Sequence, residues 1–218
     1  MLSVVVPALN AGATIGPCLE QLTTANEILV VDGGSSDRSA SIAAHAGATV
    51  IRAHRGRGVQ LAAGAAAAKG DWLLFLHADT RLANGWPEAI DHHMATHSQQ
   101  AACFRFQLDS TAWQARIVER GVALRVRLLG LPYGDQGLLI SRELYDALGG
   151  YRALPLMEDV DLVRRIARRR LRVLDADAVT SAARWRRDGW LRRSARNLLC
   201  LALYLAGMSP ARIVRLYG

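Results

Sequence analysis

The chain has 218 residues, of which 51% are hydrophobic and 21% charged, so it can bury a normal core without disulfides and is not a disordered segment. It carries 27 basic and 19 acidic residues, for a formal net charge of +8, and Lys69 is its only lysine. Cys18, Cys103 and Cys200 are odd in number and widely spaced, which excludes a disulfide framework and a CxxC motif and predicts buried thiols in a reducing compartment.

Charge and hydropathy bear on targeting and on partners. The chain starts without a basic leader and cleavage site, and no apolar run approaches the ~18 residues of a membrane span, so we expect a cytoplasmic protein. Arginines cluster at 164–172 and 184–196, but no nucleic-acid-binding motif accompanies them, so nucleic acid is not an expected partner. The clusters fit either a solvated basic surface or contacts with anionic lipid or phosphate-bearing substrates.

Short apolar runs alternate with helical patterns through the first half, which predicts an α/β fold with a mostly parallel central sheet flanked by helices. Strands are expected at 2–6, 27–31, 49–52 and 72–76, with Pro7 ending the first, and helices at 14–23, 37–47 and 59–69. Three strands lead into polar clusters, at 7–10, 32–37 and 77–80. Ligands of open α/β sheets bind outside the carboxyl ends of the strands, so these clusters predict a binding site.

The second half has a less regular pattern. Strands are expected at 101–108, 137–141 and 171–174, and helices at 113–129, 142–148 and 158–170. The tail from 190 to 217 is predicted to form two helices separated at 207–210. No linker or repeat interrupts the chain, so we expect a single domain over 1–218 with a helical C-terminal tail.

Asp79 is a candidate metal ligand. It follows an apolar strand, where a carboxylate facing the ligand crevice suits a hard cation that also binds phosphate oxygens. His77 shares this side if the strand continues, so it could be a second ligand or a hydrogen-bond donor. The alternative is that Asp79 is a turn or helix-capping residue.

The turn at 32–37 is a candidate for contacts with a nucleotide. Gly33 and Gly34 would let the backbone approach a ligand closely, and Asp32 could accept hydrogen bonds from a base or ribose. Asp37 is better suited to capping the next helix. The G-x-G-x-x-G pattern is absent here, which disfavours a dinucleotide cofactor.

Carboxylates of the second half supply the candidate base. Glu158 and Asp159 lie at a predicted helix start, where both stabilise the helix dipole or Asp159 takes a proton from a hydroxyl. Asp135 lies in a glycine-flanked turn, where it orients a ligand or simply makes the turn.

Three arginines, Arg55, Arg57 and Arg184, are candidates for binding a diphosphate, because guanidinium groups match phosphate oxygens. Trp185 could offer a stacking face to a sugar or a lipid. Taken singly, each residue is also explained by surface exposure or packing.

In this order, the clusters resemble the family 2 glycosyltransferases over residues 2 to about 185. The segments at 4–10, 30–37 and 70–80 are similar to the family's donor loop, nucleotide-binding turn and metal-binding DxD strand. Glu158-Asp159 looks like its ED pair, and Arg184-Trp185 like the last half of its QxxRW motif. Departures are His77 for the first aspartate of DxD, Gly33 for a nucleobase-contacting aspartate, Ala11 for a common glutamate and Ser181 for the glutamine of QxxRW.

The resemblance, which extends to a compact bacterial subgroup, implies a GT-A type fold and an inverting hexosyltransferase. Such an enzyme moves a sugar from a nucleoside-diphosphate sugar to a hydroxyl acceptor with Mg²⁺ or Mn²⁺. The donor-binding half would be about 1–100, and the acceptor half with the C-terminal helices about 101–218. Implied site residues are Asp159 and Glu158 for catalysis; Pro7, Asn10, Asp32, Gly33, Arg57, Ala78 and Arg184 for the donor; Asp135, Gln136 and Trp185 on the acceptor side; and Asp79 and His77 for the metal.

Other interpretations stay open. A nucleotidyltransferase also combines a nucleotide-binding α/β half with a metal aspartate, and His77 with Gly33 fit a degenerate module that binds sugar nucleotides without turnover. The tail at 190–205 has arginines early and apolar residues later. It would pack on the core, form a homodimer contact, or lie on the inner face of the membrane and meet a lipid-linked acceptor.

Overall fold

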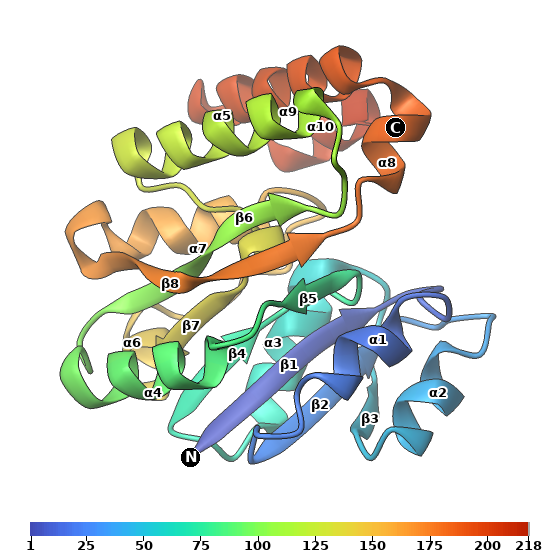
Figure 1. The fold of residues 1–218 in the computed structure, drawn as a ribbon, viewed down its shortest axis with the longest axis vertical. Helices are drawn as coiled ribbons and strands as arrows, with labels where there is room; N and C mark the ends of the chain where they lie inside the picture. Colours follow the sequence, from blue (N-terminus) through green and yellow to red (C-terminus); the bar gives the residue numbers. More distant parts are fainter. Residues whose placement is uncertain (218) are drawn as a thin grey trace.

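The computed structural model describes residues 1–217, with the side chain of Tyr217 left out, and its elements alternate as expected (Figure 1). The strands are β1 (Leu2–Ala8), β2 (Glu27–Asp32), β3 (Thr49–Arg52), β4 (Trp72–Phe75), β5 (Thr80–Leu82), β6 (Ala101–Leu108), β7 (Leu138–Ser141) and β8 (Leu171–Thr180). The helices are α1 (Ile15–Glu20), α2 (Ser39–His45), α3 (Arg57–Ala67), α4 (Trp86–Thr96), α5 (Trp113–Leu129), α6 (Arg142–Ala147), α7 (Glu158–Ile166), α8 (Ala183–Asp188), α9 (Trp190–Leu205) and α10 (Pro210–Tyr217). Short 3-10 turns lie at Gly134–Gln136 and Arg168–Arg170.

The strands form one sheet in the order β3-β2-β1-β4-β7-β6-β8-β5. Strands β1 to β4 are mutually parallel where they pair, and β8 runs parallel to β6. The antiparallel pairings are β4 with β7, β6 with β7, and β5 with β8. The structure therefore confirms the predicted α/β fold with a mostly parallel sheet, its flanking helices and its helical tail.

Alternate side chains of β1 enter different layers of the core. Val4 and Val6 face the layer that contains α1, α2 and α4, and Val5 faces the layer that contains α3, α6 and α7. This two-sided burial explains why the strand is apolar throughout. Because β1 and β4 are parallel neighbours, the loops that follow them lie together at one edge of the sheet.

The C-terminal helices form a further layer, beyond β6 and β8 in Figure 1. Cys200 and Leu201 of α9 and Ile213 of α10 are buried against Val160 and Val163 of α7. Of the interpretations of the tail, packing on the core therefore describes its inner face. No helix within residues 1–217 is long and apolar enough to cross a bilayer.

The first strand continues through Pro7 to Ala8, so the prediction that Pro7 ends it is wrong by two residues. Ala8 O accepts from Gly33 N on the β2 side, and Val5 O accepts from Leu76 N on the β4 side. Successive residues of a strand face opposite neighbours, so the backbone of Pro7 faces β4, and the pairing of β1 with β4 ends at Val5. The missing N–H of Pro7 therefore costs no bond between strands.

The two largest differences from the expected boundaries lie in the second half of the chain. The helix expected at 158–170 ends at Ile166, because Ala167 has a φ of 64° that breaks the helical hydrogen bonds. The strand expected at 171–174 continues to Thr180, where β6 and β5 pair with it. Strand β5 and helices α4 and α8 were not predicted.

The three cysteines are unpaired and buried, as predicted. Burial raises the pKa of the Cys18 and Cys103 thiols to about 12. These thiols stay protonated at neutral pH, so they act as small core residues.

Candidate active site

Two adjoining cavities open beyond the carboxyl ends of β1 and β4. The larger, of about 520 Å³, lies between the loops after β1 and β4 and the start of α3. The smaller, of about 90 Å³, lies between the start of α7, the turn at 133–135 and the segments of α8 and α9 that face it. Both are lined by Arg57, His77, Asp79, Ser181 and Arg184, so they form one continuous site.

The larger cavity brings together most of the residues predicted to bind the donor, namely Pro7, Asn10, Arg57, Ala78 and Arg184. Asn10 has a φ of 50°, and its Oδ1 accepts from Ser36 N at 2.9 Å while its own N donates to Ser35 Oγ at 2.9 Å. These bonds join the loop after β1 to the loop after β2 and fix one wall of the cavity.

Asp32 and Gly33 do not line this cavity. Asp32 is 4% exposed, and its carboxylate accepts from Gly34 N at 3.3 Å and Ser35 N at 3.1 Å, so it stabilises the turn. The amide of Gln60 lies beneath the turn, where Nε2 donates to Ala8 O at 2.8 Å and Val31 O at 2.7 Å. A Cβ on Gly33 would lie 3.0 Å from that amide. Gln60, which no sequence pattern indicated, lines the cavity instead.

Asp79 lies in the loop after β4 and lines both cavities. Within residues 1–217 its carboxylate forms no hydrogen bond and no ion pair, so both oxygens are available to a ligand. His77 lies beside it, and a Cβ added to Gly134 would be 2.5 Å from His77 Nε2, so the ring packs against the Gly134 backbone. Burial, followed by Arg57 and Arg184, holds the pKa of His77 well below its usual value, and the ring is neutral at neutral pH.

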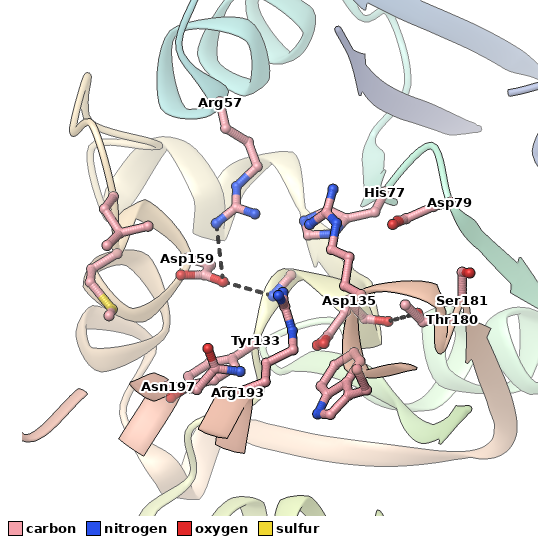
Figure 2. Close-up of a pocket in the computed structure, with 15 residues that line it drawn as sticks. Arg57, His77, Asp79, Tyr133, Asp135, Asp159, Thr180, Ser181, Arg193 and Asn197 are labelled. Carbon is pink, nitrogen blue, oxygen red and sulfur yellow. Dashed lines mark hydrogen bonds and ion pairs between the residues drawn. The ribbon is translucent and has the colours of Figure 1, made fainter. Parts of the chain in front are cut away.

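Asp159 faces the smaller cavity from the first turn of α7, opposite Asp79 (Figure 2). Its Oδ2 accepts from Gly134 N at 2.8 Å and lies 3.8 Å from Arg57 Nη2, and its Oδ1 accepts from Val160 N at 2.8 Å. Any side chain at position 134 would collide with His77. The backbone of Gly134 thus fixes the distance between His77 and Asp159.

Glu158 does not line either cavity. It is 1% exposed, and its carboxylate forms an ion pair and hydrogen bond with Arg57 Nε. Burial raises the pKa of Glu158, and the Arg57 guanidinium opposes that rise. A Cβ on Gly58 would lie 2.3 Å from Arg152 O, so only glycine lets α3 approach the segment before α7 this closely. Glu158 therefore holds Arg57 between the two cavities.

Of the residues predicted on the acceptor side, two line the smaller cavity and one does not. Asp135 and Trp185 line the smaller cavity. Gln136 is 2% exposed and lies behind it, where Nε2 donates to Phe104 O at 3.0 Å. Burial raises the pKa of Asp135 to about 6, Asp159 and Asp79 add to the rise, and Arg125 opposes it. Within the described residues, Asp135 Oδ1 is buried without a hydrogen-bond partner.

Replacing Asp135 with asparagine is expected to stabilise the protein at pH 8 but not at pH 4. The folded-state pKa of Asp135 is raised from 3.8 to about 6, so folding favours the neutral form and ionisation costs stability as the pH rises through 6. Asparagine is uncharged at both pH 4 and pH 8, so the variant avoids the cost of ionising a buried carboxyl. Above pH 6 this raises the free energy of unfolding by up to about 3 kcal/mol. Urea unfolding of Asp135→Asn and the parent at both pH values tests this, and an equal difference at both would contradict it.

The smaller cavity also contains residues that the sequence did not single out. Tyr133, Arg193 and Asn197 line it, and Figure 2 shows Tyr133 and Asn197 near Asp159. Arg193 and Asn197 lie one turn apart on α9, and no family motif extends that far. The one available signal was their i, i+4 spacing on one face of the polar first half of this helix.

The fold is that of the GT-A glycosyltransferases. Residues 3–152 match the model of glycosyl transferase family 2, and the chain belongs to this family. No curated protein matches the chain. It is similar to glucosyl-3-phosphoglycerate synthase from Mycobacterium tuberculosis in complex with phosphoglyceric acid, at 23% identity, with a TM-score of 0.56 over 83% of this chain and 70% of that chain. It is also similar to residues 1–349 of TarS from S. aureus, at 15% identity, with a TM-score of 0.66 over 99% of this chain and 68% of that one.

Proposed function

We propose that this glycosyltransferase moves a sugar from a nucleoside-diphosphate sugar to a hydroxyl acceptor in one inverting displacement that depends on a divalent cation. The observation that carries the proposal is the pair of adjoining cavities, with Asp79 at their junction and Asp159 facing the smaller one. The larger cavity takes the donor, and the smaller one takes the acceptor hydroxyl.

The charges of the larger cavity suit a diphosphate. Its charged lining residues are Arg55, Arg57, Arg184 and Asp79, so three guanidinium groups face one carboxylate. Guanidinium groups bind phosphate oxygens in pairs of hydrogen bonds, and they offset the charge that develops on a departing diphosphate. Most of the lining comes from residues 7–79, which supports the assignment of donor binding to the first half.

Asp79 fits a cation that shares its coordination with the donor. The described residues, 1–217, contain no cluster of three or more His, Cys, Asp or Glu side chains able to hold a metal ion by themselves. Mg²⁺ and Mn²⁺ bind through one or two carboxylates together with substrate phosphates, so one unpaired carboxylate is a sufficient protein ligand. When bound, the cation would supply positive charge to the leaving diphosphate. The synthase from M. tuberculosis has been solved with Mn²⁺, uridine diphosphate and glucosyl-3-phosphoglycerate, which supports a divalent cation and a nucleoside diphosphate as ligands here.

Asp159 is the proposed base. Its carboxylate is held by Gly134 N and Val160 N, which leaves it oriented toward the smaller cavity. It takes the proton of the acceptor hydroxyl, the hydroxyl oxygen bonds to the anomeric carbon, and the bond from that carbon to the diphosphate oxygen breaks. The neutral His77 ring packs against Gly134 and keeps this geometry rigid. Attack on the face opposite the leaving group inverts the anomeric centre.

A thermal-shift screen of nucleoside diphosphates and nucleotide sugars, with Mn²⁺ and with a chelator, tests the proposal. We expect one nucleotide to raise the melting temperature by several degrees in Mn²⁺, because ligands that bind only the folded state stabilise it. Asp79→Ala should lose the Mn²⁺-dependent part of the shift. Asp71→Ala is the matched control, since Asp71 lies at the opposite end of β4 with its side chain 83% exposed. A shift that neither chelator nor Asp79→Ala changes would contradict the metal site, and nucleotide binding without turnover of any donor would indicate a degenerate module.

A further inference from the structure

An apolar groove extends from the smaller cavity between α5 and α9. Its volume is about 710 Å³, and its apolar walls include Trp113 and Ile117 of α5 and Trp190, Leu191 and Leu198 of α9. The groove and the smaller cavity share Tyr133, Trp185 and Asn197 as lining residues. A ligand in the groove would therefore reach the space that Asp159 faces.

The helices at and near the groove carry most of the large exposed hydrophobic side chains among residues 1–217. Trp113 is 68% exposed, Leu191 is 87% exposed and Leu198 is 59% exposed. Apart from Met1 and Val173, every large exposed hydrophobic residue within 1–217 lies on α5, α9 or α10. Apolar surface gathered in one place on a protein usually marks a binding site.

The same three helices carry the positive charge of the protein. They contain nine arginines and a single acidic residue, Glu119, which leaves a net charge of +8 on them. The formal net charge of the whole chain is also +8, so the remaining residues are neutral in sum. Arg125 and Arg192 line the groove itself. Its occupant is therefore expected to combine hydrocarbon with negative charge.

Two details at the groove indicate a ligand. Gly121 lies in the interior of α5, where glycine costs about 0.5–1 kcal/mol relative to alanine, yet a Cβ there would meet no atom within 4 Å. Packing does not require this glycine, and it leaves the groove open. At the junction with the smaller cavity, Trp185 Nε1 and Asn197 Oδ1 are buried and have no hydrogen-bond partner among residues 1–217. Buried polar atoms are normally paired, so these two are suited to the polar head of a ligand.

We propose that the groove holds the hydrocarbon chain of an anionic lipid acceptor, whose hydroxyl enters the smaller cavity beside Asp159. The chain lies against Trp113, Leu191 and Leu198. Arg125 and Arg192, which line the groove, supply positive charge for its anionic head group, and Trp185 and Asn197 contact the head. This inference rests on the proposed function, because it identifies the class of acceptor for that same site.

Binding of butyl, octyl and dodecyl phosphate, each below its micellar concentration, tests the inference by isothermal titration calorimetry. We expect Kd to fall by about threefold to fourfold for each methylene that the groove covers. Gly121→Leu fills the groove and should weaken dodecyl phosphate binding at least tenfold with little effect on butyl phosphate. Because position 121 is helical and unobstructed and leucine favours a helix more than glycine does, this variant should fold with a melting temperature no lower than that of the parent.

Leu198→Gln and Leu199→Gln form a matched pair, since the two leucines are adjacent and 59% and 54% exposed, but only Leu198 lines the groove. Only Leu198→Gln should weaken dodecyl phosphate binding. Equal Kd values across the chain lengths, or equal losses in both variants, would overturn the inference. Dimerisation in size-exclusion chromatography that Gly121→Leu abolishes would also overturn it, because a second copy would then cover the groove.

The nucleotide thermal shift, measured on the same samples, separates the two proposals. If the parent protein shows the nucleotide thermal shift but its Kd for alkyl phosphates does not depend on chain length, only the lipid acceptor is rejected. If the parent protein shows no nucleotide thermal shift, the proposed function itself is rejected.

Discussion

Replacing Asp159 with asparagine is expected to lower the rate of sugar transfer by about 1,000-fold, within the range that general bases contribute. Asparagine has nearly the same shape and can still accept one hydrogen bond from Gly134 N or Val160 N, but it cannot take the proton of the acceptor hydroxyl. Binding of the donor should change little, because Asp159 does not line the larger cavity. The measurement is the rate of nucleoside diphosphate release from the donor that gives the largest thermal shift.

Asp161→Asn is the control for this experiment. Asp161 lies two residues along the same helix and is 9% exposed, but its carboxylate pairs with Arg165 at 2.6 Å and Arg152 at 3.2 Å, away from both cavities. We expect this variant to lose stability and to keep most of its transfer rate. If Asp159→Asn, folded and able to bind nucleotide, transfers sugar at the parent rate, Asp159 is not the base.

Replacing Arg57 with alanine is expected to destabilise the protein by about 3–5 kcal/mol and to abolish transfer. Arg57, whose side chain is 36% exposed, compensates the charge of Glu158, which is 1% exposed, so its removal leaves an uncompensated charge in the interior. Arg57 also lines both cavities, so its loss removes a phosphate contact and displaces the group beside Asp159. Urea unfolding measures the first effect, and nucleotide thermal shift together with diphosphate release measures the second.

The double variant Arg57→Ala, Glu158→Gln separates these two roles. Glutamine removes the buried charge, so the double variant should recover most of the lost stability. It should not recover nucleotide binding or transfer, because the guanidinium group is still missing. Recovery of activity with stability would show that Arg57 acts only as a partner for Glu158. If the double variant recovers neither stability nor activity, the buried charge of Glu158 is not the source of the instability.

Several elements could be predicted because their patterns are local. The expected bounds of the strand at 49–52, the strand at 101–108 and the helix at 113–129 agree with β3, β6 and α5. Apolar residues repeat in these segments with the period of a strand or a helix, so neighbouring residues alone indicate them. Among the elements that were not predicted, β5 and α8 are short, whereas α4 has 11 residues, and β5 exists as a strand only because β8 pairs with it.

The candidate site was predicted where it follows strand ends. Pro7, Asn10, Ala78 and Asp79 line the larger cavity because parallel strands β1 and β4 end at the same edge of the sheet. That relation depends only on the order of strands and helices along the chain. Asp159 was a candidate base from its place at a predicted helix start and from the family resemblance, and the structure places it across the smaller cavity from Asp79.

The direction of each polar side chain was not predictable. Asp32 has the residue type and position of a nucleotide ligand, but its carboxylate turns back to Gly34 N and Ser35 N. Gln136 and Glu158 likewise turn away from the cavities, toward Phe104 O and Arg57. A buried polar group takes whichever partner the packing offers. The partners of Gln136 and Glu158 come from segments 32 and 101 residues away along the chain.

The sequence by itself determined the order of elements, the edge of the sheet where the two cavities open and the family, because periodicity and strand-end positions are properties of neighbouring residues. Only the tertiary structure decided that Arg57 lies between two cavities, that Gln60 replaces Asp32 as a wall, and that the outer faces of α5 and α9 form an apolar groove beside Asp159. These features require contacts between segments far apart in the chain, and the energy of such contacts depends on how the layers pack rather than on any local pattern.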